Sequence, residues 1–180
     1  MDKEKIVAVY RRRASSYNSD VKFFNLIGWR VNFYRKIAIK ALNLSKGDTV
    51  VDLCCGTGLN FSDLFNAVGP EGKIIGVDLS ADMLKVAEKQ VREQGWNNFT
   101  LIHKDAAKYR FPDEINSIVT SYAITLIPEF DTIISRGANS LTEGGRFVIL
   151  DFKKPKSWPD WLAKLMLSLC SSNPMAERMN

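Results

Sequence analysis

The sequence predicts an α/β fold in which a mostly parallel sheet is covered by helices. Two observations lead to this prediction. Apolar residues recur at helical spacing up to about residue 46, and from Thr49 onward short β-branched runs alternate with helical stretches. A chain of 180 residues is long enough for one domain with a single core. We therefore expect one domain, made of an amino-terminal helical segment (1–46), a sheet-containing core (47–155) and a carboxyl-terminal helix (156–180).

Two apolar stripes predict the amino-terminal helices. The first stripe consists of Ile6, Tyr10, Ala14 and Tyr17. The second stripe consists of Phe23, Ile27, Val31, Tyr34, Ala38 and Leu42, and Gly28 is placed to interrupt it. The helical pattern ends at Lys46-Gly47-Asp48.

Five β-branched runs predict the strands of the core, at residues 49–53, 73–77, 99–103, 115–121 and 146–151. Ser80 is placed to cap a helix that ends at Gly95. A further helical stripe (Ile133, Ile134, Gly137, Ala138, Leu141) leads to a helix ending at Gly144-Gly145. In such folds ligands bind beside the carboxyl ends of the strands, so we expect the functional residues there.

Composition excludes several classes of protein. A hydrophobic share of 46% is typical of a globular protein, and no apolar run approaches the roughly 18 residues of a membrane span. The cysteines (Cys54, Cys55, Cys170) lack the partners and spacing of a disulfide scaffold or metal site. The charged start, Met1-Asp2-Lys3-Glu4, is unlike a signal peptide, so we expect a cytoplasmic protein. Base-recognition modules are absent, and we expect no nucleic-acid partner.

The strongest local motif runs from Val50 to Gly58, where a buried strand enters a glycine turn before a helix. Such a turn lets a ligand approach the backbone, and dinucleotide-binding proteins use a similar one. The discriminating residue is Asp52 near the strand's end, which would repel a pyrophosphate and attract the cationic groups of S-adenosylmethionine. Opposite charges about 4 Å apart attract by roughly 4 kcal/mol before desolvation. The motif therefore favours S-adenosylmethionine over NAD.

Two further acids follow the next two strands. Asp78 ends the second strand, where a carboxylate can accept both ribose hydroxyls of a nucleoside. Leu79 and Met83 would then contact the adenine. Asp105 follows the third strand and could accept the adenine amino proton, with Ala106 leaving room for the ring, or it could cap the local turn.

From about Asp48 to Pro155 the sequence resembles the class I S-adenosylmethionine-dependent methyltransferases. The matching segments are Asp52 to Gly58, Asp78 to Leu84, Asp105-Ala106, Ser121-Tyr122, Leu141 to Arg146 and Leu150 to Pro155. Within that class it is similar to the methyltransferases of ubiquinone and menaquinone biosynthesis and to the bacterial phosphatidylethanolamine N-methyltransferases. The segment Tyr10 to Asn18 resembles the helical lid that closes over the cofactor in these enzymes.

The resemblance implies a Rossmann-like fold, S-adenosylmethionine as cofactor, S-adenosylhomocysteine as product and no metal. The residues expected at the cofactor are Tyr17, Asp52, Cys54, Gly56, Thr57, Gly58, Asn60, Asp78, Leu79, Met83, Asp105, Ala106, Ser121 and Tyr122. Tyr122 is also the one candidate catalytic residue, either orienting an acceptor or lining the pocket. The only histidine, His103, is expected to be structural or solvent-facing.

The sequence departs from these enzymes in two places. Thr125 and Leu126 stand where the quinone enzymes carry an Arg-Asn pair, and the run from Tyr122 to Pro128 is closer to the phospholipid enzymes. The residues after Asp151 are too few for the sixth and seventh strands, so we expect these strands to be missing or reduced. The apolar stretch from Trp158 to Leu169, flanked by lysines, suits either a membrane interface or the covering of a sheet edge or second subunit.

We expect, from these observations, a methyltransferase acting on a small lipophilic acceptor, either a phospholipid-like amine or a quinone. Peripheral contact with a membrane, or a homodimer, would fit the carboxyl-terminal stretch. The main alternative is a protein that binds S-adenosylmethionine for regulation, without turnover. A nicotinamide-dependent oxidoreductase is disfavoured by Asp52.

Overall fold

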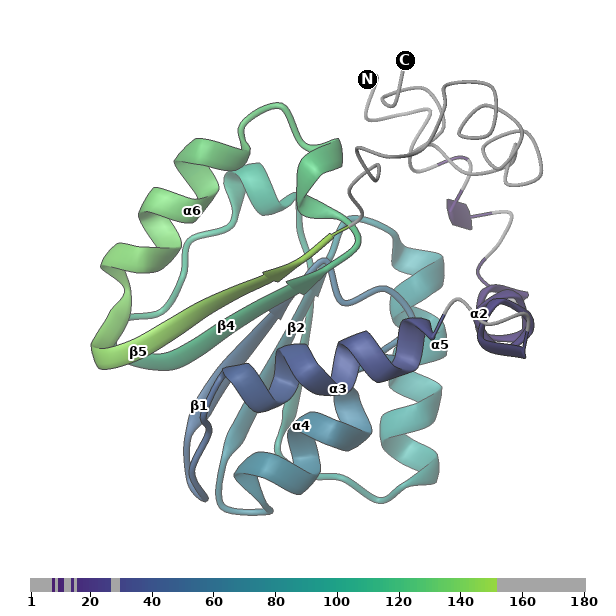
Figure 1. The fold of residues 1–180 in the computed structure, drawn as a ribbon, viewed down its shortest axis with the longest axis horizontal. Coiled ribbons are helices and arrows are strands. Elements are labelled where there is room, and N and C mark those ends of the chain that lie inside the picture. Colours follow the sequence, from purple (N-terminus) through teal and green to yellow (C-terminus); the bar gives the residue numbers. More distant parts are fainter. Residues whose placement is uncertain (1–7, 9, 12–13, 15, 27–29, 152–180) are drawn as a thin grey trace.

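A computed structural model describes residues 8, 10–11, 14, 16–26 and 30–151. Within these ranges five parallel strands form one sheet in the order β3-β2-β1-β4-β5 (Figure 1). Their bounds are β1 Thr49–Leu53, β2 Lys73–Asp78, β3 Phe99–His103, β4 Ile115–Ser121 and β5 Leu141–Leu150. The predicted α/β class with a parallel, Rossmann-like sheet is confirmed. The order reverses beside β1, which leaves a crevice between the ends of β1 and β4.

Three helices cover one face of the sheet, with α3 and α4 in front of the strands in Figure 1. Their bounds are α3 Val31–Ala41, α4 Phe61–Val68 and α5 Ala81–Glu93. Ile39 of α3 and Leu64 of α4 pack on Val50 of β1, all buried. Alternate residues of a strand face opposite sides, so this face also receives Asp52. The predicted cap of α5 is confirmed, since the Ser80 hydroxyl accepts from the Met83 N–H at 3.4 Å.

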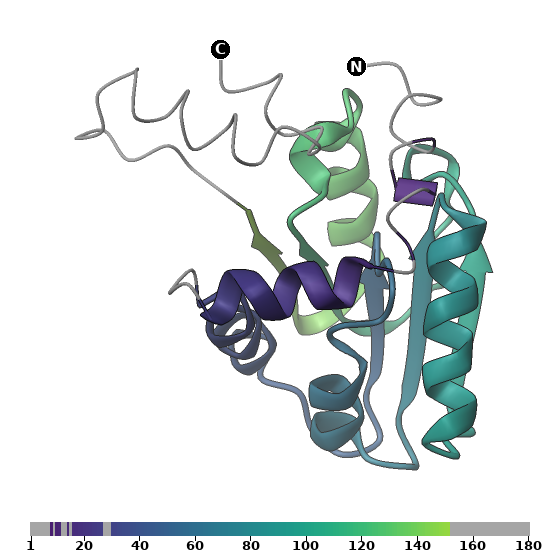
Figure 2. The same ribbon diagram turned by 90° about the vertical axis from the view of Figure 1, so that its right-hand side faces the viewer.

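The opposite face is covered by α6 (Phe130–Asn139) and by two short 3₁₀ helices, η1 (Ala106–Lys108) and η2 (Ile124–Leu126). Ile133 of α6 and Ile124 of η2 belong to the same buried cluster as Val51 of β1. The view in Figure 2 separates α5 from α6, which lie on different sides of the strands. The sheet is therefore the middle layer of three.

Helix α2 (Tyr17–Leu26) lies across the end of α3, away from the lower part of the sheet (Figure 2). Its Val21 packs with Val31 of α3 and Tyr122 after β4, and all three are buried. The amide of Asn25 accepts from the Asn32 N–H at 3.0 Å, which joins the two helices. Helix α2 therefore approaches the carboxyl ends of the strands.

Three sequence-based expectations need correction. The helix expected to reach Gly144-Gly145 is α6, and it ends at Asn139 because Leu141 already pairs with Ile115 in the sheet. Strand β5 consequently begins at Leu141, five residues before the expected 146. A bulge between Ile115 and Ser117 accommodates the Gly144 turn. The stripe that placed Tyr34 on the buried side of α3 is also wrong, since Tyr34 is 47% exposed and Arg35 only 7%. The expected carboxyl-terminal helix, the reduced last strands and Ile6 lie outside the described residues.

Candidate functional site

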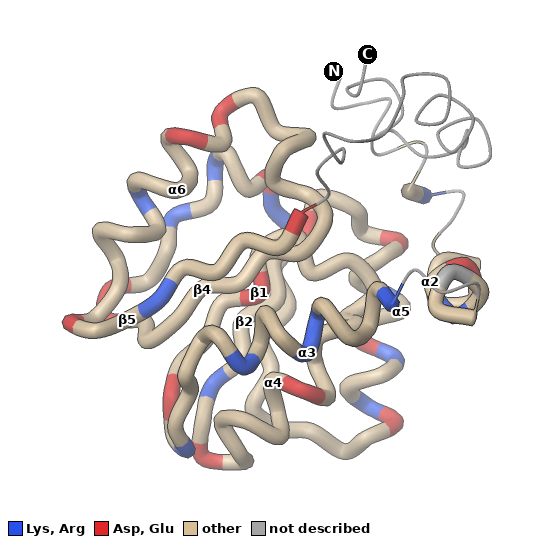
Figure 3. Tube along the Cα trace, in the orientation of Figure 1, with Lys and Arg blue, Asp and Glu red and all other residues tan. Residues whose placement is uncertain are grey.

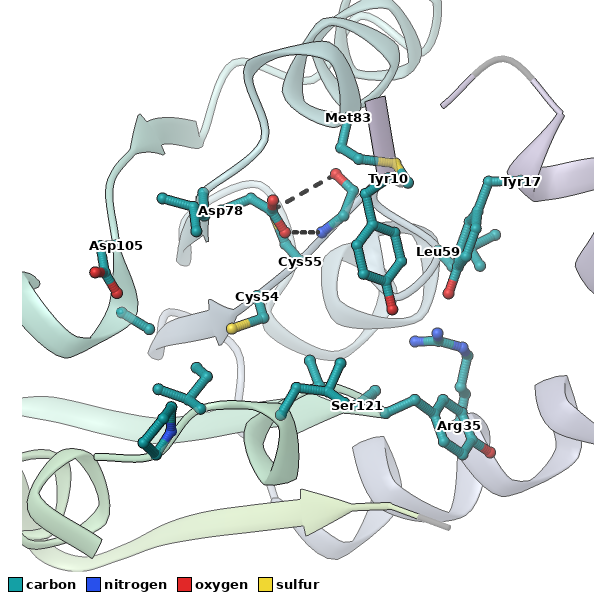
Figure 4. Close-up of a pocket in the computed structure, with 18 residues that line it drawn as sticks. Tyr10, Tyr17, Arg35, Cys54, Cys55, Leu59, Asp78, Met83, Asp105 and Ser121 are labelled. Atoms are coloured by element: carbon teal, nitrogen blue, oxygen red, sulfur yellow. Dashed lines mark hydrogen bonds between the residues drawn. The ribbon is translucent and has the colours of Figure 1, made fainter. Parts of the chain in front are cut away.

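A pocket opens over the carboxyl ends of β1, β2 and β4, roofed by tyrosines from the amino-terminal segment (Figure 4). Of the residues expected at the cofactor, those that line it are Tyr17, Cys54, Gly56, Asp78, Leu79, Met83, Asp105, Ala106, Ser121 and Tyr122. Four expected residues do not line it, namely Asp52, Thr57, Gly58 and Asn60. The lining also includes Tyr10, from the segment expected to form the lid, and residues that were not among those expected at the cofactor: Arg35, Cys55, Leu59, Ala123, Leu126, Ile127 and Pro128.

The turn after β1 forms the floor of the pocket. Cys54, Gly56 and Gly58 have positive φ angles of 60°, 57° and 81°. A Cβ at Gly58 would lie only 2.6 Å from a ring carbon of Phe61, so glycine is required there for steric reasons as well. Cys54 accepts a left-handed conformation that costs a non-glycine residue roughly 1–2 kcal/mol. The expected tight turn therefore forms with cysteine in it.

Asp78 binds the turn to the start of α5. One carboxylate oxygen accepts from the Gly56 N–H at 2.7 Å and the other from the Ser80 N–H at 2.8 Å. Figure 4 shows this side chain directed across the pocket floor toward the turn. Burial raises the pKa of Asp78, and hydrogen bonds from the Ser80, Gly56 and Leu79 backbone oppose that rise. A carboxylate has about four lone-pair sites, so capacity to accept from a ligand hydroxyl remains.

Asp105 and Ala106 lie at the far end of the pocket, after β3. The Asp105 carboxylate accepts from the Ala107 N–H at 2.9 Å and so caps η1. Both residues line the pocket, so the capping role and the proposed contact with a ligand are compatible. Ala106 is buried and leaves an apolar wall beside the carboxylate.

Asp52 is fully buried behind the pocket. Its two carboxylate oxygens accept from the Asn60 side-chain amide at 3.1 and 3.2 Å, and the same amide nitrogen lies 3.3 Å from the Ser121 hydroxyl. Burial raises the pKa of Asp52 to about 7, although the Asn60 hydrogen bonds and the charge of Arg35 lower it. Asp52 therefore does not line the pocket as expected. The Asn60 side chain connects its carboxylate to Ser121, which does line the pocket.

Arg35 completes this network from α3. Its Nη1 donates to the Asn60 side-chain oxygen at 2.9 Å, and its guanidinium lies over the Tyr122 ring at 5.1 Å. The sequence does carry a signal for it, since Arg35 falls on the buried side of α3 with Val31, Ala38 and Ile39. A charged residue on a buried helix face is rare unless it is paired or functional.

Aromatic residues form the roof and one wall. Tyr10 and Tyr17 meet edge to face with ring centroids 6.3 Å apart, and both line the pocket. The Thr57 hydroxyl donates to the side-chain oxygen of Asn18 at 2.6 Å, which ties α2 to the turn after β1. Tyr122 is buried, which raises the pKa of its hydroxyl to about 12.

Other candidate groups lie elsewhere. The His103 ring is exposed, contacts the Leu79 carbonyl at 2.9 Å and does not line the pocket. Burial raises the pKa of the Cys54 and Cys55 thiols, so neither is a thiolate at neutral pH. In the ranges that the structure describes, no group of three or more His, Cys, Asp or Glu side chains could hold a metal ion. None of the described helices has the length and hydropathy needed to cross a bilayer.

Comparison with known proteins places the chain among methyltransferases. Residues 1–164 match the ubiE/COQ5 methyltransferase family. The demethylmenaquinone methyltransferase of Anoxybacillus flavithermus is 33% identical over 156 residues, covering 84% of this chain and 64% of the relative. That of Geobacillus kaustophilus is 35% identical over 153 residues, with 84% and 62% covered. The chain thus spans somewhat less than two thirds of the length of these relatives.

Solved structures agree with this assignment. An S-adenosylmethionine-dependent methyltransferase from Clostridium acetobutylicum has a TM-score of 0.60 and 26% identity, with 74% of this chain and 56% of that chain covered. A SAM-dependent methyltransferase from Aquifex aeolicus has a TM-score of 0.58 and 20% identity, with 74% and 77% covered, and supports the fold alone.

Proposed function

The chain belongs to the ubiE/COQ5 methyltransferase family, and we propose that it transfers the methyl group of S-adenosylmethionine to a small lipophilic acceptor of the quinone type. One observation carries the cofactor assignment. The Asp78 carboxylate is held at the pocket by the Gly56 and Ser80 N–H groups and keeps the capacity to accept from a ribose hydroxyl.

The order of the strands suggests how the bound cofactor runs along the pocket, from its adenine to its methionine end. Asp105 follows β3, Asp78 ends β2, and the turn at Cys54 follows β1, and these strands are neighbours in the sheet. With the adenine beside Asp105 and Ala106 and the ribose on Asp78, the methionine part extends over the turn toward β4. The roof of Tyr10 and Tyr17 would then exclude water from the sulfonium.

Asp52 supports the cationic cofactor from a distance. Its carboxylate is buried, so its charge acts on the pocket through the amide of Asn60 and the hydroxyl of Ser121. A bound sulfonium and ammonium favour the ionised form of Asp52 and lower its pKa from about 7. A pyrophosphate would do the opposite, and this difference disfavours a nicotinamide cofactor.

The transfer itself needs alignment more than acid–base chemistry. An electron-rich atom of the acceptor attacks the methyl carbon, the carbon–sulfur bond breaks with its electrons on sulfur, and S-adenosylhomocysteine leaves. A quinone ring carbon is nucleophilic enough only in the reduced quinol state, and it loses its proton after the transfer. A Tyr122 hydroxyl with a pKa of about 12 stays protonated, so it can orient the acceptor as a hydrogen-bond donor but cannot act as a base.

The pocket lining that follows β4 suits an apolar acceptor, because Leu126, Ile127 and Pro128 line the pocket together with Tyr122. The relatives are named demethylmenaquinone methyltransferases, although this chain has Thr125 and Leu126 where we expected an Arg-Asn pair in such enzymes. The Thr125 hydroxyl donates to an Asp151 carboxylate oxygen at 2.8 Å, so this position serves to fix the loop after β4. A phospholipid amine is the alternative acceptor.

A lipophilic acceptor implies contact with a membrane surface, and two helices offer one. Leu26 of α2 is 83% exposed, and Phe33 and Ile37 of α3 are 46% and 48% exposed. Helix α3 carries basic residues and no acidic one, as Figure 3 shows. Basic residues close to an anionic surface contribute about 1 kcal/mol each. Liposome flotation tests this contact: binding should increase with anionic lipid and decrease with salt, whereas a dimer interface would leave the protein unbound.

Incubation with methyl-labelled S-adenosylmethionine tests the function. We expect label to enter a reduced demethylmenaquinol and not phosphatidylethanolamine, with S-adenosylhomocysteine formed in equal amount. Label in phosphatidylethanolamine would show that the acceptor is a phospholipid amine and not a quinol, and would leave the proposed methyltransferase activity intact. Tight binding of S-adenosylmethionine without transfer to either acceptor or to cell extracts would favour the regulatory alternative. Tighter binding of NAD than of S-adenosylmethionine would overturn the assignment of S-adenosylmethionine as the cofactor.

A further inference from the structure

Arg35 is a buried cation directed into the pocket, and its recorded contacts satisfy only part of its hydrogen-bonding capacity. Its side chain is 7% exposed and lines the pocket. Its Nη1 donates to Asn60, and its Nε, fully buried, has no hydrogen-bond partner among the described residues. A guanidinium carries five N–H donors, and burying a cation without a matching anion is costly.

The groups around Arg35 are mostly neutral. Asn60 offers its amide oxygen to Arg35 and its amide nitrogen to Asp52, so it lies between the two charges. Tyr122 contributes the face of its ring. With a pKa of about 7, Asp52 is only partly ionised at neutral pH and compensates Arg35 incompletely. The pocket end at Arg35 is therefore prepared for an anion.

The position of Arg35 indicates which anion. Figure 4 places Asp105 and Arg35 at opposite ends of the pocket, with Asp78 and Cys54 between them. If the adenine lies at Asp105 and the ribose at Asp78, the end of the cofactor that reaches Arg35 is its amino-acid end. The only anionic group of S-adenosylmethionine is the carboxylate at that end.

We propose that Arg35 binds the α-carboxylate of S-adenosylmethionine and thereby fixes the amino-acid end of the cofactor between α3 and the turn after β1. This inference rests on the proposed function. A guanidinium suits the task because it matches a carboxylate with parallel N–H donors. Its contact with Asn60 fixes the side chain before the ligand arrives, so little side-chain entropy is lost on binding.

Calorimetry with two ligands that differ only in the carboxylate tests the inference. S-adenosylmethionine carries this group, and decarboxylated S-adenosylmethionine keeps the sulfonium and the amine without it. The wild type should bind S-adenosylmethionine about 10- to 150-fold more tightly than the decarboxylated ligand, the range for a charge-assisted hydrogen bond. Arg35→Met should lose this preference by weakening only S-adenosylmethionine.

The matched control is Arg30→Met. Arg30 precedes the same helix and also lies over an aromatic ring, Phe33 at 4.4 Å, but it is exposed and does not line the pocket. This variant should keep the wild-type preference. Arg35→Lys should retain the fold and part of the preference, since lysine keeps the charge and loses the planar fork. It serves as the test if Arg35→Met does not fold.

Equal affinity of the wild type for the two ligands would overturn the inference, and so would an Arg35→Met variant that weakens both ligands by the same factor, which would indicate a structural role. If the wild type binds neither ligand, the proposed function itself fails. The two failures are therefore distinguishable.

Discussion

The side-chain amide nitrogen of Asn60 lies 3.1 and 3.2 Å from the two carboxylate oxygens of Asp52, in a position where both residues are buried. Asn60 directly precedes α4 and Asp52 belongs to β1, so this contact joins the glycine turn to the strand before it. The amide compensates the carboxylate only in part, because burial still raises the pKa of Asp52 to about 7. The turn is therefore built around an acid whose charge depends on pH.

Stability of the ligand-free protein should decrease with pH because of Asp52. Its pKa is about 7 in the folded state and 3.8 in the reference state. The folded form retains a proton that the unfolded form releases, so this contribution is fully present below pH 3.8 and is lost as the pH approaches 7. Between about pH 4.5 and 7.5 the loss is about 3 kcal/mol. Urea unfolding of the wild type and of Asp52→Asn across this range should show a smaller loss in the variant, where the loss that remains includes the contribution of Asp78, whose pKa burial also raises.

The control for this measurement is Asp113→Asn, which alters an exposed carboxylate far from the turn and should keep the wild-type pH dependence. An Asp52→Asn protein with the same slope as the wild type would mean that Asp52 is ionised in the fold at all of these pH values.

Asp78→Ala should reduce both ligand affinity and stability. The change removes the acceptor of the Gly56 and Ser80 N–H groups, and unpaired donors of this kind cost about 1–3 kcal/mol of stability. Loss of the ribose contact should weaken S-adenosylmethionine by a further 1.5 to 3 kcal/mol, by the rough cost of charge-assisted hydrogen bonds. Calorimetry and urea unfolding measure the two effects separately. If Asp78→Ala binds S-adenosylmethionine within twofold of the wild-type affinity, the ribose does not bind at Asp78.

Asn18→Ala should loosen the roof of the pocket. The change removes the acceptor of the Thr57 hydroxyl, a single hydrogen bond worth about 0.5–1.5 kcal/mol. We expect S-adenosylmethionine to bind up to about tenfold more weakly, with little change in melting temperature. Ser19→Ala, at an exposed neighbouring position of α2, is the control. A large loss of stability would instead make α2 part of the folding core.

Gly76→Ala should destabilise the sheet below the pocket. An added Cβ would lie 2.9 Å from a Leu101 methyl carbon, 3.0 Å from the Phe61 ring and 3.1 Å from the Cys55 sulfur. Overpacking of this kind costs typically 1–3 kcal/mol. Thr100→Ala, on the adjacent strand β3 at an exposed position, should be nearly neutral by comparison. Urea unfolding measures both, and an unchanged midpoint for Gly76→Ala would show that Leu101 and Phe61 can move.

The sequence predicts the strands well and the buried polar network poorly, for identifiable reasons. β-branched runs such as Thr49–Leu53 are short, apolar and bounded by turn residues, so local pattern suffices. Leu141 continues the spacing of α6, and only its pairing with Ile115 moves it into β5. Asp52 was expected to face the ligand, but its position in β1 directs it behind the turn. Arg35 was missed because Tyr34, with the more apolar side chain, also fits the helical spacing of Val31 and Ala38, whereas the packing of α3 buries Arg35 and exposes Tyr34.

The last prediction separates two roles for Tyr122, orienting the acceptor or only lining the pocket. Its hydroxyl stays protonated at neutral pH, since burial raises its pKa to about 12. As a donor to the acceptor it would act in the transfer step, so Tyr122→Phe should lower kcat/KM for the acceptor by up to about tenfold, the value of one hydrogen bond. The affinity for S-adenosylmethionine should stay within about twofold, because the ring and its contact with Arg35 remain. Tyr109→Phe is the matched control: its hydroxyl is buried, has no hydrogen-bond partner among the described residues and does not line the pocket. A Tyr122→Phe enzyme with unchanged turnover would assign the residue to the pocket wall alone, and a parallel loss of cofactor affinity would assign it to the cofactor.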